Sequence, residues 1–138
     1  MELLQEQKIE NTVFLTGDTH RAVALALHPE EEYMTYTRSC TEKPLAWELY
    51  TASITSGNDD RMPLPERRAK EKAVFDKTIN PHLLYADLAA HGYYITRIGR
   101  DSLSADYYFV DSLTTRRTGE RKAASFAMNA DEFILKTS

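Results

Sequence analysis

The chain has 138 residues, about the size of one domain, and its 42% apolar and 28% charged residues are ordinary values for a folded globular protein. The net charge of −4 argues against a general nucleic-acid binder, and no apolar run is long enough to span a membrane. Cys40 is the only cysteine, which excludes an internal disulfide, and the acidic first residues do not have the pattern of a signal peptide.

The first predicted elements surround an apolar run. A short helix is expected over residues 2–8, followed by a strand over 12–16. Because Val13–Leu15 is continuously apolar, we expect this strand to be buried on both faces. Residues 22–27 alternate small and larger apolar side chains, a pattern that fits a helix or a strand, and we favour a strand because His28-Pro29 ends the run.

The rest of the chain predicts further strands and two helices. Pro65 can begin a charged surface helix that extends to about Lys77. Asn80 and Pro81 can cap and begin a second, short helix that ends before Gly92. Apolar patterns predict strands over residues 33–37, 46–54, 93–98, 103–110 and 123–128, a hairpin formed by 93–98 and 103–110, and packing of 133–135 against the core.

The strand over 12–16 ends at Gly17, and Asp18 and His20 follow it. In extended backbone, residues two apart point to the same side about 6.5 Å from each other, which suits ligands of one metal or of two neighbouring metals. Gly17 allows a turn with positive φ. A helix-capping or turn-capping Asp and a solvated His are an alternative explanation of the same two residues. Catalytic metal sites, moreover, usually have three protein ligands. These two residues therefore need further ligands from elsewhere.

Other familiar hydrolase and nucleotide-binding signatures are absent. The sequence has no Gly-x-Ser-x-Gly elbow, no P-loop and no dinucleotide fingerprint. Arg21 fits a phosphate contact or a surface charge, and the hydroxyl side chains of 53–56 fit a cleft lining or bonds within their own loop. His28 and His91 lie in predicted turns and receive no role.

Four segments, in order, resemble one family. They are Asn11–His20, Thr51–Gly57, Asn80–Leu88 with Gly92-Tyr93 after it, and Ala105–Asp111. Together they resemble the PhoD-like alkaline phosphatases, which belong to the calcineurin-like metallophosphoesterases, although Ala52 stands where proline is frequent in that family. The likeness extends over about residues 2–113. We therefore assign 1–113 to the C-terminal portion of a PhoD-like domain and 114–138 to a variable extension.

The resemblance implies a fold and a chemistry. The fold would be α/β, the C-terminal half of a four-layer α-β-β-α sandwich with a mixed sheet. The activity would be metal-dependent hydrolysis of a small phosphoester, with Asp18 and His20 as metal ligands and His82 and Asn80 as catalytic groups near the same strand end. For His82 a simply packed histidine, and for Asn80 a helix cap, are the alternatives. The ions would be calcium, iron, zinc or manganese, and metal affinity should fall at low pH because both ligands bind deprotonated.

The resemblance also implies that the chain is part of a larger unit. The other ligand motifs of the family would lie upstream of Met1, so we expect a fragment, a truncated product or one piece of a split protein. The expected partners are a missing N-terminal half or a second copy, with neither nucleic acid nor membrane. The alternative function is a non-catalytic domain with a binding or assembly role. Family members are often exported, but this sequence does not itself indicate a compartment.

Overall fold

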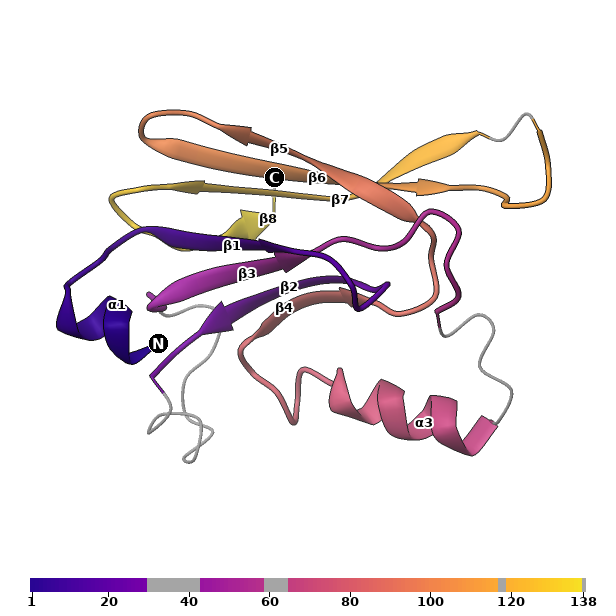
Figure 1. The fold of residues 1–138 in the computed structure, drawn as a ribbon, viewed down its shortest axis with the longest axis horizontal. Helices are drawn as coiled ribbons and strands as arrows, with labels where there is room; N and C mark the ends of the chain where they lie inside the picture. The colour runs from indigo at the N-terminus through magenta and orange to yellow at the C-terminus, as the bar shows by residue number, and fades with distance from the viewer. Residues whose placement is uncertain (30–42, 59–64, 117–118, 138) are drawn as a thin grey trace.

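We describe the fold from a computed structural model, which covers residues 1–29, 43–58, 65–116 and 119–137 (Figure 1). No helix among these residues is long and apolar enough to cross a membrane. The elements, in chain order, are α1 (Glu2–Glu6), β1 (Thr12–Thr16), β2 (Ala22–Leu27), β3 (Ala46–Tyr50), α3 (Pro65–Val74), β4 (Leu83–Asp87), β5 (Gly92–Ile98), β6 (Ser102–Val110), β7 (Glu120–Asn129) and β8 (Lys136–Thr137).

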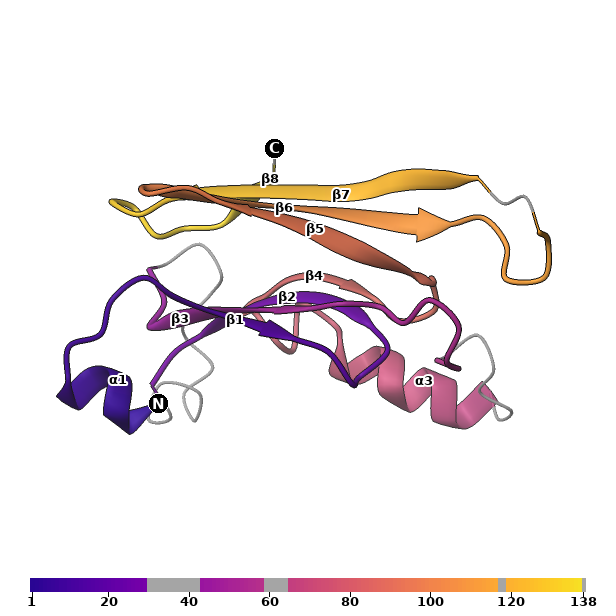
Figure 2. The same cartoon turned by 45° about the horizontal axis from the view of Figure 1, so that its top comes forward.

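The strands form two four-stranded sheets that lie face to face. Sheet 1 has the order β1-β3-β2-β4, and sheet 2 has the order β5-β6-β7-β8. In sheet 1, β1 is parallel to β3 while the other pairs are antiparallel, so this sheet is mixed as predicted; sheet 2 is antiparallel throughout. Figure 2 shows sheet 2 above sheet 1, with α1 and α3 on the opposite side of sheet 1.

The core lies between the sheets and depends on small side chains in β2. Ala22, Ala24 and Ala26 are fully buried, and they allow bulky residues of sheet 2 to approach sheet 1 closely. Opposite them, the aromatic rings of sheet 2 interlock: Tyr107 meets Phe126 edge-on, with ring centroids 5.8 Å apart. In the interior, the aromatic side chains of sheet 2 therefore pack against the alanine methyl groups of β2.

Two buried hydrogen bonds fasten the sheets to each other. The indole Nε1 of Trp47 in β3 donates to the carbonyl oxygen of Phe133 at 3.0 Å, and the hydroxyl of Tyr107 in β6 donates to the carbonyl oxygen of Val23 at 3.0 Å. Burial raises the pKa of Tyr107 far above its ordinary value, so the phenol stays protonated and remains a donor. Each bond satisfies a polar group that would otherwise be buried without a partner.

Most of the predicted elements are confirmed. The strands at 12–16 and 22–27 match the prediction, the hairpin is β5–β6, and the strand predicted over 123–128 is part of β7, which extends from Glu120 to Asn129. Phe133 and Leu135 are both buried, as expected. The charged helix ends at Val74, and β3 ends at Tyr50, each a few residues earlier than predicted. The predicted strand over 33–37 lies outside the described residues.

Two expectations are wrong. β1 is not buried on both faces: Phe14 is 40% exposed and Leu15 is 48% exposed, because β1 is an edge strand with no neighbour on one side among the described residues. The segment after Asn80 is not a helix but the strand β4, because its backbone pairs with β2. Gly92 is then no helix cap. It begins β5, where a Cβ would lie 1.9 Å from the carbonyl oxygen of Tyr108.

Residues beyond 113 are part of sheet 2. β7 pairs with β6 along its length, from Ser102 opposite Asn129 to Val110 opposite Glu120, and β8 pairs with β7. The domain boundary at residue 113 stays a prediction.

A buried carboxylate organises the outer face of sheet 2. Asp106 in β6 accepts a hydrogen bond from the Ser125 hydroxyl and forms ion pairs with Lys122 at 2.8 Å and Arg97 at 2.6 Å. Hydrogen bonds from Lys122, then Ser125 and Arg97, hold the pKa of Asp106 well below its ordinary value. Three strands are thereby linked through one side chain.

We predict that Asp106→Asn lowers the free energy of unfolding at pH 7 by about 1–3 kcal/mol, because charge-assisted hydrogen bonds are lost. The folded-state pKa of Asp106 is depressed, so this stabilisation is present above the unfolded pKa of about 4 and is lost as the pH falls toward the folded value. Urea unfolding at pH 7 and pH 3 would measure both effects. Asp131→Asn, at an exposed position, is the control. An equal wild-type advantage at both pH values would contradict the prediction.

Candidate metal centre

One end of sheet 1 collects the polar loops of the molecule. β1 and β3 end there, β2 begins there, and β4 ends there because it is antiparallel to β2, with Asp87 opposite Ala22 (Figure 1). The turn 17–21, which contains Asp18 and His20, connects β1 to β2 at this end. The two side chains are therefore positioned by the ends of β1 and β2, which both pair with β3, while Asp18 itself is exposed to solvent.

The backbone of this turn is unusual. Asp18 has a φ of 69° and His20 a φ of 59°, both in the left-handed region that residues with a Cβ rarely occupy. Gly17 was expected to take the positive φ, but among the described residues no glycine does. The extended geometry assumed from the sequence is therefore wrong for this turn. Strained residues persist where the surrounding structure fixes them, and they cluster at functional sites.

A hydrogen bond fixes the ring of His20. Its Nδ1 lies 2.9 Å from the carbonyl oxygen of Gly57. A carbonyl oxygen can only accept, so in the neutral imidazole Nδ1 carries the proton and Nε2 has the free lone pair. Ligating histidines are typically oriented by such a bond from the second ring nitrogen. In this tautomer, Nε2 is the ring nitrogen of His20 whose lone pair is directed away from the Gly57 bond.

The loop 51–58 that supplies the Gly57 carbonyl is fastened at several points. The Thr51 amide donates to the Thr16 carbonyl at 3.0 Å, at the end of β1. Toward the β4–β5 connection, the Ser53 carbonyl accepts from the Gly92 amide at 2.9 Å, and the Asn58 side chain donates to the Ala90 carbonyl at 3.1 Å. The loop thus connects β1 to the start of β5, with His20 bonded to it.

His91 belongs to this end of the sheet, although the sequence gave no reason to assign it a role. It is buried, and its Nδ1 lies 3.5 Å from the Ser53 hydroxyl oxygen. The Ser53 hydroxyl donates to the Ser56 carbonyl within the loop. His91 therefore packs beneath the loop that orients His20.

His82 and Asn80 lie at the opposite end of the sheet. The Ala26 amide donates to the His82 carbonyl at 2.9 Å, so His82 sits four residues along β2 from Ala22, about 13 Å away at the spacing of a strand. Burial and then the neighbouring His28 lower the pKa of His82. Asn80 donates to the Val74 carbonyl at the end of α3. The expected convergence of His82 with Asp18 and His20 is wrong, because the segment is a strand antiparallel to β2.

Two other charged residues near the turn are held by local contacts. Asp87 accepts from the amides of Ala89 and Ala90, at 3.0 and 2.8 Å, and so closes its own turn. Arg21 donates to the Thr19 carbonyl at 3.2 Å, with its guanidinium 6.0 Å from the ring centre of Phe75. These contacts favour a role in stabilising the local backbone, and not a role as ligands, for both side chains.

The donor set fits a metal but does not complete its coordination. Asp18 is exposed, a Cβ on Gly17 would meet nothing within 4 Å, and the Nδ1 bond leaves Nε2 of His20 as the donor atom, so the turn offers one carboxylate and one imidazole to a metal. Within the described parts of the chain, no three His, Cys, Asp or Glu side chains form a metal-binding group. A metal held by Asp18 and His20 would therefore need further ligands from outside these residues.

Comparisons with known proteins identify the family of this chain. The family model of the PhoD-like phosphatases matches residues 1–107, so the chain belongs to that family. No curated protein matches the sequence.

A solved structure described as "Structure of PhoD" matches with a TM-score of 0.74 and 25% sequence identity. The match covers 99% of this chain and 24% of the solved chain. The predicted fold, the C-terminal part of a PhoD-type α/β sandwich, is confirmed. The chain spans about a quarter of the length of the protein it matches.

We predict that loosening the loop 51–58 frees the His20 ring. Asn58→Ala removes the bond to Ala90, so the share of the Nδ1–H tautomer of His20 should fall while the fold is kept. Nitrogen chemical shifts of the imidazole would report the tautomer without any metal. Asn80→Ala is the matched control, because it removes the same kind of amide-to-carbonyl bond at the other end of the sheet. Equal tautomer shares in all three proteins would contradict the prediction.

We also predict that the strain at Asp18 is kept for function and not for stability. Asp18→Gly relieves a left-handed backbone, so the free energy of unfolding should not fall, whereas Thr19→Gly should lose about 0.5–1 kcal/mol. Metal binding should be lost in the first variant and kept in the second. Denaturant unfolding and metal titration measure the two properties. A larger stability loss in Asp18→Gly than in Thr19→Gly would contradict the prediction.

Proposed function

We propose that this chain supplies Asp18 and His20 as ligands to the metal centre of a PhoD-like phosphoester hydrolase. The observation that carries the proposal is the bond from His20 Nδ1 to the Gly57 carbonyl, which leaves Nε2 available for a metal. Family membership over residues 1–107 makes phosphate ester chemistry the best-supported class of reaction.

The residues fit divalent or mixed metal ions, with calcium, iron, zinc and manganese as candidates. Bound ions would supply Lewis acidity toward a phosphate oxygen and an activated water. The chain's own contribution is positional. The strands β1 and β2 fix the ends of the turn, Gly57 orients the His20 ring, and Asp18 adds an exposed carboxylate to the same turn. The substrate class is a small phosphoester.

His82 and Asn80 are left out of this proposed site. The register of β2 with β4 separates them from His20, and Asn80 is already engaged with the end of α3. The site as proposed therefore rests on Asp18 and His20 with the loop 51–58.

Metal binding tests the proposal directly. Titrating the chain with Mn²⁺, Zn²⁺ and Ca²⁺ in a calorimeter should show weak binding that is reduced by at least about tenfold in His20→Ala and in Asp18→Ala. His82→Ala is the matched control, because it removes a histidine at the far end of the sheet. The control should bind like the wild type. Equal losses in His82→Ala and His20→Ala would overturn the assignment.

The same proteins test the dependence on further ligands. Because a catalytic metal site usually has three protein ligands, the chain alone should show negligible turnover of p-nitrophenyl phosphate with any of these metals. Metal-dependent turnover that both Asp18→Ala and His20→Ala abolish would show that two ligands suffice. It would then contradict the expected incompleteness while supporting the metal site.

A further inference from the structure

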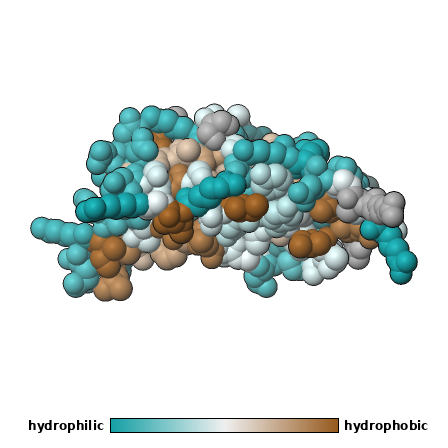
Figure 3. Space-filling model, turned by 90° about the horizontal axis from the view of Figure 1, so that it is seen from above, coloured by the Kyte–Doolittle hydropathy of each residue, from teal (hydrophilic) through white to brown (hydrophobic). Residues whose placement is uncertain are grey.

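A single charged residue lies in the three strands around the turn 17–21. Among the residues of β1, β2 and β3, all of which the structure describes, Glu48 of β3 is the only one with a charge. β3 lies between β1 and β2, and the register places Glu48 between Phe14 and Leu25. Phe14 is 40% exposed, and Figure 3, which views the side of β1 and β5, shows hydrophobic patches among the polar side chains there. A half-buried carboxylate between apolar neighbours needs hydrogen-bond partners in place of the water it has lost.

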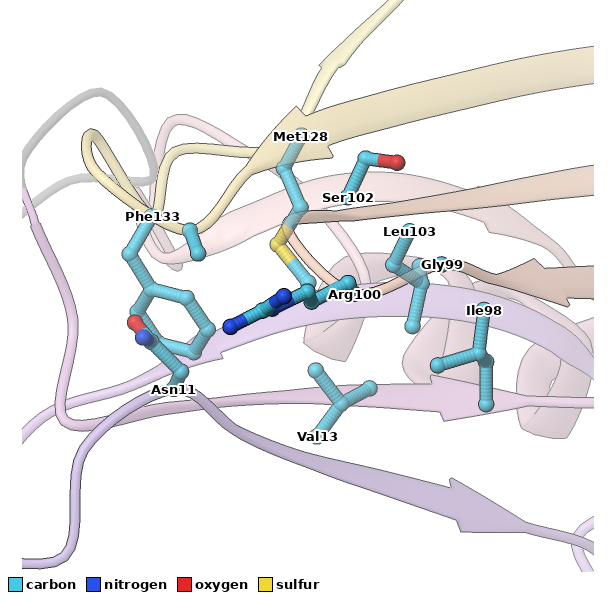
Figure 4. A pocket seen from close by; sticks show the side chains of 10 residues that line it. Asn11, Val13, Ile98, Gly99, Arg100, Ser102, Leu103, Met128 and Phe133 are labelled. Atoms are coloured by element: carbon cyan, nitrogen blue, oxygen red, sulfur yellow. The ribbon is translucent and has the colours of Figure 1, made fainter.

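Glu48 lies on the face of sheet 1 that is turned away from the core. Its neighbours in β3, Trp47 and Leu49, belong to the core, so the alternation of side chains along a strand puts Glu48 on the other face. Figure 4 shows the same alternation from the side of β1, where Val13 is directed into the hollow between the sheets. Thr16, three residues further along β1, therefore faces the same way as Glu48.

Two hydroxyl groups satisfy the Glu48 carboxylate. The Thr16 hydroxyl donates to Oε1 of Glu48 at 2.8 Å. Tyr50, two residues further along β3 and on the same face, also forms a hydrogen bond with Glu48. Burial first, and then this bond and the charge of Glu48, raise the pKa of Tyr50 to about 12, so the phenol stays protonated at neutral pH and remains a donor. Glu48 is thus held from its own strand by Tyr50 while it holds Thr16 in the neighbouring strand.

Thr16 is the last residue of β1, and it is fixed through both its backbone and its side chain. Its carbonyl oxygen accepts from the Thr51 amide at 3.0 Å, and its hydroxyl is bonded to Glu48. Two residues later, Asp18 has the left-handed φ of 69°. Backbone in this region persists only where the surrounding structure fixes it. The bond between Thr16 and Glu48 therefore fixes the residue from which the strained turn starts.

We propose that Glu48 is a positioning residue for the candidate metal centre. By accepting from the Thr16 hydroxyl, it holds the end of β1 so that the turn keeps the backbone that presents Asp18 and His20. Glu48 acts through Thr16 and is not itself a ligand. The expected effect on metal binding rests on the proposed function, whereas the backbone conformation at Asp18 is observed independently of it.

Substitutions that remove this bond test the proposal in the whole chain. Glu48→Ala and Thr16→Val should each move the amide nitrogen and Cα chemical shifts of Asp18, which report its backbone conformation without any metal. Each should also weaken Mn²⁺ binding about tenfold in a calorimeter. Glu48→Gln keeps an acceptor and Thr16→Ser keeps a donor, so both should stay close to the wild type. Thr12→Val is the matched control, because it makes the same change on the same face of β1 at the other end of the strand.

The chemical shifts of Asp18 decide the proposal. Thr16→Val keeps the branched shape of the side chain, so it gives the answer even where Glu48→Ala does not fold. Asp18 shifts that Thr16→Val leaves unchanged, or that Thr12→Val moves equally, would overturn the proposal. A loss of unfolding free energy with wild-type shifts at Asp18 would assign Glu48 to sheet stability alone and overturn it as well. A wild-type chain that binds no Mn²⁺ would contradict the proposed function, and the Asp18 shifts would still decide the role of Glu48.

Discussion

The structure depends on how closely its two sheets can approach. β2 presents only alanine methyl groups to the interior, which leaves room for Tyr107, Phe109 and Phe126 of sheet 2. Aromatic side chains contribute large buried areas, and the small partners let them do so without splitting the sheets apart. The bond from Tyr107 to the Val23 carbonyl then fixes how sheet 2 is placed along β2. A larger residue at Ala24 would force the sheets apart and disturb this bond.

The packing of β2 also determines where the turn of the candidate metal centre begins and ends. Because β2 is fixed between β3 and β4, its first residue Ala22 has little freedom, and the turn 17–21 must connect it to β1 within five residues. A connection this short, between strands that are separated by β3, accounts for left-handed backbone at Asp18 and His20. The geometry of the candidate ligands is in this sense a consequence of the sheet order. The loop 51–58 then fixes the ring of His20 from the side of β3.

Local sequence pattern predicted the elements whose partners are near in the chain, and it failed where distant partners decide. The β5–β6 hairpin follows from alternation on both sides of a short turn, and its bounds were predicted within a residue. For the segment 80–92, Asn80-Pro81 and Gly92 are good helix signals. Pairing of Leu83–Asp87 with β2, about 60 residues earlier, nevertheless outweighs them. The misplaced His82 follows from that error, because β4 begins at the opposite end of sheet 1 from the turn that carries His20.

The burial of β1 could not be predicted from its sequence, for a related reason. An unbroken apolar run indicates that both faces of a strand meet apolar surface, but it does not say which polypeptide supplies that surface. In this chain β3 covers one side of β1, and Leu15 reaches the solvent on the other. The residues that made the sequence prediction wrong are the exposed side chains of this edge strand. The Asp18–His20 turn lies at the end of that edge strand, so the exposed apolar side chains of β1 lie next to the turn that carries the two candidate ligands.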